Sequence, residues 1–155
     1  MGKIYNIILE STVGTNGTNS NKSYYIDWGR LPDGPYKVTF AFRTSESAHL
    51  NVTVANIFVD LGQGMNTVIA QNISASSSYR SNYLGFLFVT GTGNAHMLFS
   101  ETTTNPPLYI DQKPNNNNVL VQINTNTAPF DTDYGGSVGQ YTLVLSFEKQ
   151  DFFKF

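Results

Sequence analysis

The sequence predicts an all-β protein: a single jelly roll, that is a Greek-key β-sandwich, of about eight strands with no significant helix. Large apolar residues alternate with polar or small ones over residues 36–42, 118–124 and 141–147, a period typical of strands with one buried face. Phe40 and Leu145 lie centrally in two of these runs, so we expect both in the core. Only 13% of the chain is charged. The Asn, Thr, Ser, Gly and Tyr that replace charge favour strands and turns over helices.

The first third of the chain predicts three strands. They cover residues 4–10, 24–28 and 36–43. A polar loop over residues 11–23 precedes the second strand. Residues 31–35, Leu-Pro-Asp-Gly-Pro, supply the corner before the third strand, because Pro sets φ, Gly permits positive φ and Asp can bond its own backbone.

The middle of the chain predicts one irregular strand and one strand buried on both faces. Residues 50–61 carry apolar side chains whose phase slips by one near Ala55 and Asn56, so we expect a β-bulge or a bend there. Residues 66–73 form a weaker predicted strand. Residues 84–90 are nearly all apolar, which suits a strand covered on both sides.

The last third predicts short strands separated by polar turns. They cover residues 96–100, 108–110, 118–124 and 139–149, and a long polar loop occupies residues 128–139. Long loops near both ends of the chain favour Greek-key crossings over a meander, and hence a jelly roll. An immunoglobulin-like sandwich is the alternative, weakened because the Cys…Trp…Cys pattern is missing.

Residues 1–149 are predicted to form one β-sandwich domain, and residues 150–155 a short aromatic tail. Phe152, Phe153 and Phe155 give this tail a large apolar surface that is costly to leave in water. Termini are usually disordered unless something holds them. The three phenylalanines are therefore candidate subunit contacts, with capping of the protein's own core as the other interpretation.

Charge and composition exclude several classes of function. The net charge of −2 offers no basic surface for nucleic acid. No apolar run approaches the roughly 18 residues of a membrane span. The absence of cysteine removes disulfides and thiol chemistry. Residues 1–10 resemble a strand rather than a signal peptide, so we expect no secretion by that route.

No constellation of residues predicts catalysis, a metal site or a cofactor. His49 and His96 are the two histidines, and neither accompanies a nucleophile motif. Asp131 and Asp133 form a close carboxylate pair, but calcium takes about six to eight oxygens and this loop supplies too few. We therefore expect a protein that is not an enzyme and holds no cofactor.

Two features have both a structural and a sugar-binding interpretation. Trp28, the single tryptophan, is predicted to pack in the core beside the corner, with a stacking platform for a sugar ring as the alternative. Residues 115–118 are consecutive asparagines. They predict a flexible turn, and hydrogen bonding to sugars is the other interpretation.

One pattern in the first third of the chain resembles a known group of proteins. It consists of the opening Ile4-Tyr5-Asn6-Ile7-x-Leu9-x-Ser11, an Asn/Thr/Ser-rich loop, and the block Tyr24-x-Ile26-Asp27-Trp28-x-x-Leu31-Pro32-Asp33-Gly34-x-Tyr36-x-Val38-Thr39-Phe40-x-Phe42. The pattern resembles small β-rich structural proteins of virophages, polinton-like viruses and large DNA viruses of algae and protists. The resemblance implies a single jelly-roll capsid or capsid-associated protein, with no catalytic residues.

The resemblance and the composition together lead to an expected function. We expect a structural protein of a double-stranded DNA virus, namely a minor capsid, vertex (penton-like) or cement component that acts by subunit contacts. Its partners would be other capsid proteins, in a homo-oligomer or hetero-assembly, within a virion assembled in the host cytoplasm or nucleus. A lectin-like carbohydrate-binding β-sandwich is the alternative, because the low-charge surface rich in Asn, Thr, Ser and Tyr suits both roles.

Overall fold

The computed structural model describes residues 2–14, 21–44, 54–61, 83–90, 97–125 and 140–151. These residues form strands and one short 3₁₀ helix, η1 (Trp28–Arg30). The strands are β1 (Ile4–Glu10), β2 (Asn21–Tyr25), β3 (Tyr36–Thr44), β4 (Val54–Asp60), β5 (Tyr83–Thr90), β6 (Met97–Ser100), β7 (Leu108–Ile110), β8 (Asn118–Thr125) and β9 (Tyr141–Lys149). The predicted all-β class is confirmed for this part of the chain.

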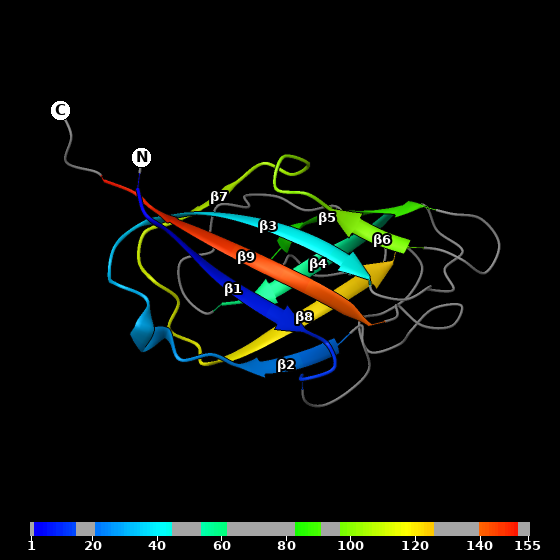
Figure 1. Ribbon diagram of the computed structural model, residues 1–155, viewed down its shortest axis with the longest axis horizontal. Coiled ribbons are helices and arrows are strands. Elements are labelled where there is room, and N and C mark those ends of the chain that lie inside the picture. The colour runs from blue at the N-terminus through cyan, green and yellow to red at the C-terminus, as the bar shows by residue number, and fades with distance from the viewer. Residues whose placement is uncertain are drawn as a thin grey trace.

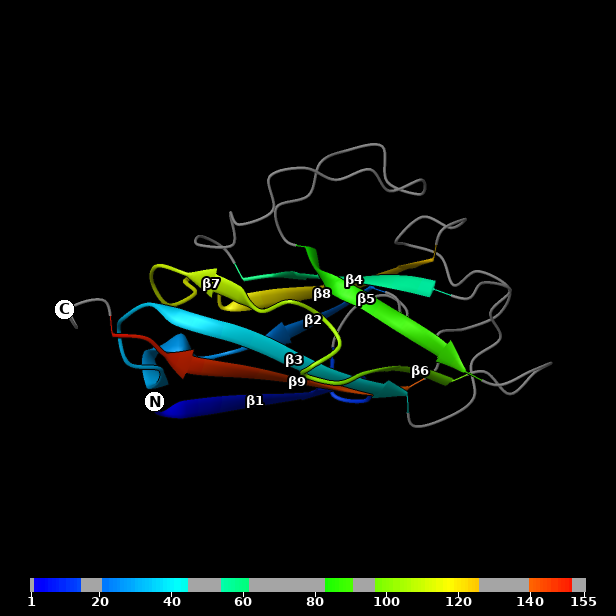
Figure 2. The same ribbon diagram turned by 90° about the horizontal axis from the view of Figure 1, so that it is seen from above.

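The order in which the strands pair is that of a jelly roll. It runs β1-β9-β3-β6-β5-β4-β8-β2, and β7 adds to β3. Every pair is antiparallel. Figure 2 shows β1, β9, β3 and β6 in one layer and β5, β4, β8 and β2 in the other. Successive strands β1 to β4 therefore alternate between the layers, which produces two interlocked Greek keys.

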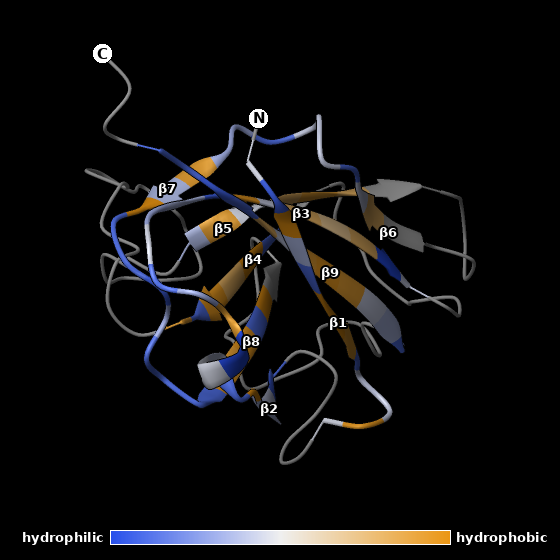
Figure 3. Ribbon diagram, turned by 60° about the vertical axis from the view of Figure 1, so that its left-hand side comes forward, coloured by the Kyte–Doolittle hydropathy of each residue, from blue (hydrophilic) through white to orange (hydrophobic). Residues whose placement is uncertain are grey.

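The core lies between the two layers and is centred on β3 and β9. Figure 1 shows these two long strands side by side, in register from Tyr36 opposite Lys149 to Thr44 opposite Tyr141. Alternate residues of both strands are buried, and Figure 3 shows hydrophobic residues recurring along them. Phe40 lies opposite Leu145 and both are buried, so the core prediction is confirmed for both.

The corner before β3 differs from its prediction. A strand was expected over residues 24–28, but β2 begins earlier, at Asn21, and ends at Tyr25. Trp28 instead opens η1, because Asp27 caps this turn: its Oδ1 accepts a hydrogen bond from the Gly29 amide at 3.0 Å. A side chain that accepts a hydrogen bond from the amide two residues later competes with the hydrogen bonds between strands. The strand therefore ends before Asp27.

The irregularity predicted in the fourth strand is present, but one or two residues later than expected. The register with β5 shifts between Ile57 and Phe58, not at Ala55 and Asn56. Ile57, Phe58 and Val59 are all buried. In a regular strand, Phe58 would project from the face opposite to Ile57 and Val59. A β-bulge changes the direction of a side chain locally.

The prediction that residues 84–90 are buried on both faces of the sheet is wrong for the end of β5. Leu84 and Leu87 are buried, but Phe88 is 39% exposed. Phe88 lies where β5 pairs with β6 and the two layers join. Its ring contacts Phe86 and Phe99. The predicted strand at residues 66–73 and the loop at residues 128–139 lie outside the described residues.

Candidate functional site

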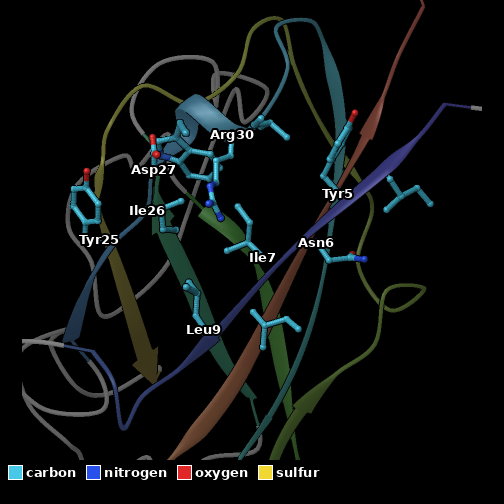
Figure 4. Close-up of a pocket in the computed structure, with 12 residues that line it drawn as sticks. Tyr5, Asn6, Ile7, Leu9, Tyr25, Ile26, Asp27 and Arg30 are labelled. Carbon is cyan, nitrogen blue, oxygen red and sulfur yellow. The ribbon is translucent and has the colours of Figure 1, made fainter.

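A groove opens between the two strands that end the sheet order, β1 and β2 (Figure 4). Its volume is about 870 Å³. One wall is residues 4–9 of β1, and the other is residues 25–28 with Arg30 and Leu31. The groove is therefore the open side of the sandwich, where one sheet edge faces the other.

The backbone of β1 is paired on one side only. The Lys149 amide donates to the Lys3 carbonyl at 2.9 Å, and the Ser11 amide donates to the Tyr141 carbonyl at 3.0 Å. Hydrogen-bonding residues alternate along an antiparallel strand, so the odd-numbered residues of β1 bond to β9. The amides and carbonyls of Ile4, Asn6 and Ile8 point the other way, and they have no backbone partner among the described residues.

The side chains of this edge are unusually apolar for an exposed strand. Ile4 is 48% exposed and Ile8 is 64% exposed, on the face of β1 that points away from the core. Edge strands commonly carry lysine, proline or a bulge that discourages pairing with another chain. The register of β1 against β9 is regular from residue 4 to residue 10, and no lysine or proline lies within it. The edge is therefore competent to receive a further strand.

The opposite wall combines an aromatic ring with charge. Tyr25 is 75% exposed and lies at the rim, next to the partly buried Ile26. Figure 4 shows the Arg30 side chain extending from η1 toward Ile26 and Ile7. The one ion pair found among the described residues joins Lys113 to Asp33 and does not involve Arg30. The groove thus offers apolar walls and one charged side chain of each sign, Asp27 and Arg30, beside unpaired backbone groups.

Trp28 has the structural role that the sequence favoured. Its side chain is buried, its Nε1 donates to the Asn116 carbonyl at 2.8 Å, and its ring meets Phe147 edge to face at 5.5 Å. A buried ring has no free face on which a sugar can stack. The core interpretation of Trp28 is therefore confirmed.

The asparagine run from residue 115 to residue 118 also has a structural role. The Asn118 amide donates to Asn116 Oδ1 at 3.1 Å, and the Ile26 amide donates to the Asn117 carbonyl at 2.8 Å. With the bond from Trp28 to Asn116, these contacts attach the run to β2 and η1. The run therefore lies in the loop that leads into β8, and these hydrogen bonds attach that loop to the rest of the molecule.

Several other residues that the sequence singled out lie outside the described residues. They are His49, His96, Asp131, Asp133, Phe152, Phe153 and Phe155. Within the described part of the chain, no group of three or more His, Cys, Asp or Glu side chains could hold a metal ion. In that same part no helix is long and apolar enough to cross a membrane.

Comparison with known proteins adds no assignment. No protein-family model matches the chain, and a search of curated proteins finds no match either.

The sequence indicated β1 as a strand but did not indicate that it is an edge. A signal was present: Ile7, Ile8 and Leu9 form an apolar run, so that Ile8 breaks the alternation. Ile4 lies on the same face as Ile8, so the face that also carries Asn6 and Glu10 has two exposed apolar residues. Which strand lacks a neighbour depends on the whole topology, so that signal alone could not locate the site.

Proposed function

We propose that the protein is a viral structural protein, a minor capsid, vertex or cement component that acts through contacts between subunits. The observation that carries the proposal is the unpaired, apolar edge of β1. Jelly rolls are a recurrent fold of viral capsid proteins. The pattern from Ile4 to Phe42 that resembles virophage and polinton-like virus proteins supports the same function.

The charge distribution of the sheet that contains β1 suits a role in a shell. On its outer face β1 and β9 place Asn6 opposite Ser146, and the Ser146 hydroxyl donates to Asn6 Oδ1 at 2.7 Å. Val144 continues the uncharged middle of this face, opposite Ile8 and Ala41. The charged residues of the face lie at its two ends: Lys37 and Glu148 at one end, and Glu10 and Arg43 at the other. Uncharged side chains in the middle allow a neighbour to approach there without the cost of removing charges from water.

The test of this proposal is incorporation into particles. The protein should copurify with virus-like particles when it is expressed with the other capsid proteins of its virus. Two substitutions on the exposed edge, Ile4→Lys and Ile8→Lys, should abolish incorporation but leave the melting temperature of the isolated protein unchanged. A matched control, Tyr109→Lys, changes an exposed aromatic residue away from the β1 edge and should incorporate normally. Incorporation that both edge substitutions leave intact would contradict the proposal.

A lectin-like function is the second candidate, and Tyr25 is the observation that favours it. Its exposed ring lies beside Asp27 and Arg30 in the groove, and carbohydrate sites commonly combine an aromatic face with hydrogen-bonding side chains. A glycan array should then show binding that Tyr25→Ala removes. Glycan binding by a protein that stays monomeric in sedimentation and enters no particle would favour this candidate over the first.

A further inference from the structure

The unpaired groups of β1 define what kind of partner the edge can take. Ile4, Asn6 and Ile8 present both an amide donor and a carbonyl acceptor outward. Their spacing is that of a strand, so the complementary ligand is another extended chain. Addition of a strand to an exposed edge obtains affinity from main-chain bonds and specificity from alternate side chains.

We infer that this extended chain is β1 of a second copy of the protein, paired antiparallel about a two-fold axis at Asn6. Outward-facing residues must lie opposite outward-facing residues for both N–H···O bonds to form. A register centred on Asn6 satisfies this rule. It places Asn6 opposite Asn6 and Ile4 opposite Ile8 of the second copy.

The side chains select this register among those that the backbone allows. Centring the pair on Tyr5 or Ile7 would also align outward residues, but it would place an isoleucine opposite Asn6. The Asn6 register instead covers both exposed isoleucines with each other. Cross-strand pairs of β-branched residues stabilise a sheet, and the match occurs twice because the contact is two-fold.

Charge selects the antiparallel direction. Lys3 lies beside the start of β1 and Glu10 ends it. Antiparallel pairing about Asn6 places Lys3 opposite Leu9 and Glu10 opposite Gly2 of the other copy, so no charges of the same sign face each other. Parallel pairing in register would instead place Lys3 beside Lys3 and Glu10 beside Glu10, and like charges across a strand pair destabilise it.

The protein's own C-terminal tail is a poor occupant of this edge. The Gln150 amide donates to the Pro35 carbonyl at 2.9 Å, so the chain leaves β9 on the side of β3, away from β1.

This inference deepens the proposed function, on which it rests for the role of the contact, but its test needs only the isolated protein. The chain has no cysteine, so Asn6→Cys introduces a single thiol on the expected two-fold axis. Opposed residues of a hydrogen-bonded pair have Cα atoms about 5.5 Å apart, within the range that a disulfide spans. Mild oxidation of the folded Asn6→Cys protein should give a disulfide-linked dimer.

Two matched variants report the register. Ile4→Cys and Ile8→Cys should each stay monomeric on oxidation, because like positions then lie about 14 Å apart along the strands. An equimolar mixture of the two should form the mixed dimer. Adding Ile8→Lys to Asn6→Cys should abolish the disulfide-linked dimer while circular dichroism shows the fold unchanged.

Sedimentation of the unmodified protein gives an independent measurement. A single strand pair is a small contact, so the fraction of dimer should be low and should rise with protein concentration. The disulfide cross-link is the more sensitive of the two measurements.

Three outcomes would overturn the inference. One is that Asn6→Cys stays monomeric in the folded state. Another is that Ile4→Cys alone cross-links as readily as Asn6→Cys, which would indicate random collision. The third is that the Asn6→Cys dimer disappears when residues 152–155 are deleted, which would identify the tail of a neighbour as the occupant. In each case incorporation into particles would still decide the proposed function separately.

Discussion

Two tyrosine hydroxyls meet inside the sandwich, where an unpaired polar group would be costly. Tyr24 on β2 donates to the hydroxyl of Tyr141 on β9 at 2.7 Å, and both side chains are buried. Burial raises the pKa of both hydroxyls above the usual value, and the effect is largest for Tyr141. This contact links the two layers, because β2 and β9 lie in different layers of the sandwich (Figure 2).

The tyrosine pair should make the stability of the protein fall at alkaline pH. The unfolded tyrosines ionise near pH 10, while the buried ones keep their protons. The stabilisation that the raised pKa values provide is therefore fully present below about pH 10 and is lost as the pH rises toward the pKa of the folded protein. The free energy of unfolding should fall by about 1.4 kcal/mol per pH unit for each tyrosine that stays protonated in the folded state. Melting temperatures from pH 8 to 12 would measure it. The double variant Tyr24→Phe/Tyr141→Phe should show a shallower decline than the wild type, and an identical decline would contradict the assignment.

The side chain of Asn105 makes the backbone hydrogen bonds to Phe86 that a neighbouring strand would otherwise make. Its Oδ1 accepts from the Phe86 amide, and its Nδ2 donates to the Phe86 carbonyl and to Ser100 Oγ, each at 3.0 Å. A Cβ added to Gly85 would lie 2.6 Å from Asn105 Oδ1, so the glycine makes room for this contact. The side chain thus continues the hydrogen bonding of β5 beyond its pairing with β6.

Asn105→Ala should destabilise the protein by about 1–3 kcal/mol, because it leaves the partly buried amide and carbonyl of Phe86 without their partner. Urea denaturation would measure the change. Asn105→Asp is a second test variant. It keeps the acceptor for the Phe86 amide but loses both donated hydrogen bonds, so it should also be destabilised. Wild-type stability of both variants would show that water replaces these bonds freely.

At the scale of elements, β3 and β9 form the centre of the sandwich. Phe40→Ala should lower the free energy of unfolding by roughly 3–5 kcal/mol if the site cannot collapse. Thr39→Ala, one residue away on the outer face, should change stability by less than about 0.5 kcal/mol. Equal effects of the two substitutions would mean that the register of β3 is inverted. A shift in the urea midpoint, measured for both variants, decides between these outcomes.

At the scale of the whole molecule, the aromatic tail at residues 150–155 remains a candidate contact between subunits. Deleting residues 151–155 should leave the melting temperature of the monomer unchanged and impair incorporation into particles, if Phe152, Phe153 and Phe155 dock on a neighbour. A drop in the melting temperature of the monomer would place them on their own sandwich instead. A truncated protein that both melts and assembles as the full chain does would refute both interpretations.

The sequence alone determined most of the described strands and the buried faces of the longest ones. The strands over residues 4–10 and 108–110 were predicted with their observed bounds, and the buried face of β3 followed from its period of two. These features are local: a side chain's direction along a strand depends only on its position in that strand. The 3₁₀ turn at Trp28 was missed, because the strand pattern from Tyr24 gave no warning that Asp27 would cap the backbone.

Only the tertiary structure decided which strands lack a neighbour and which polar groups meet. β1 becomes an edge because β9, from the far end of the chain, occupies one side of it and the described residues leave the other side open. The bonds of Tyr24 to Tyr141 and of Asn105 to Phe86 likewise join positions 117 and 19 residues apart. Pairing of distant segments depends on the packing of the whole chain, and a period of two carries no information about it.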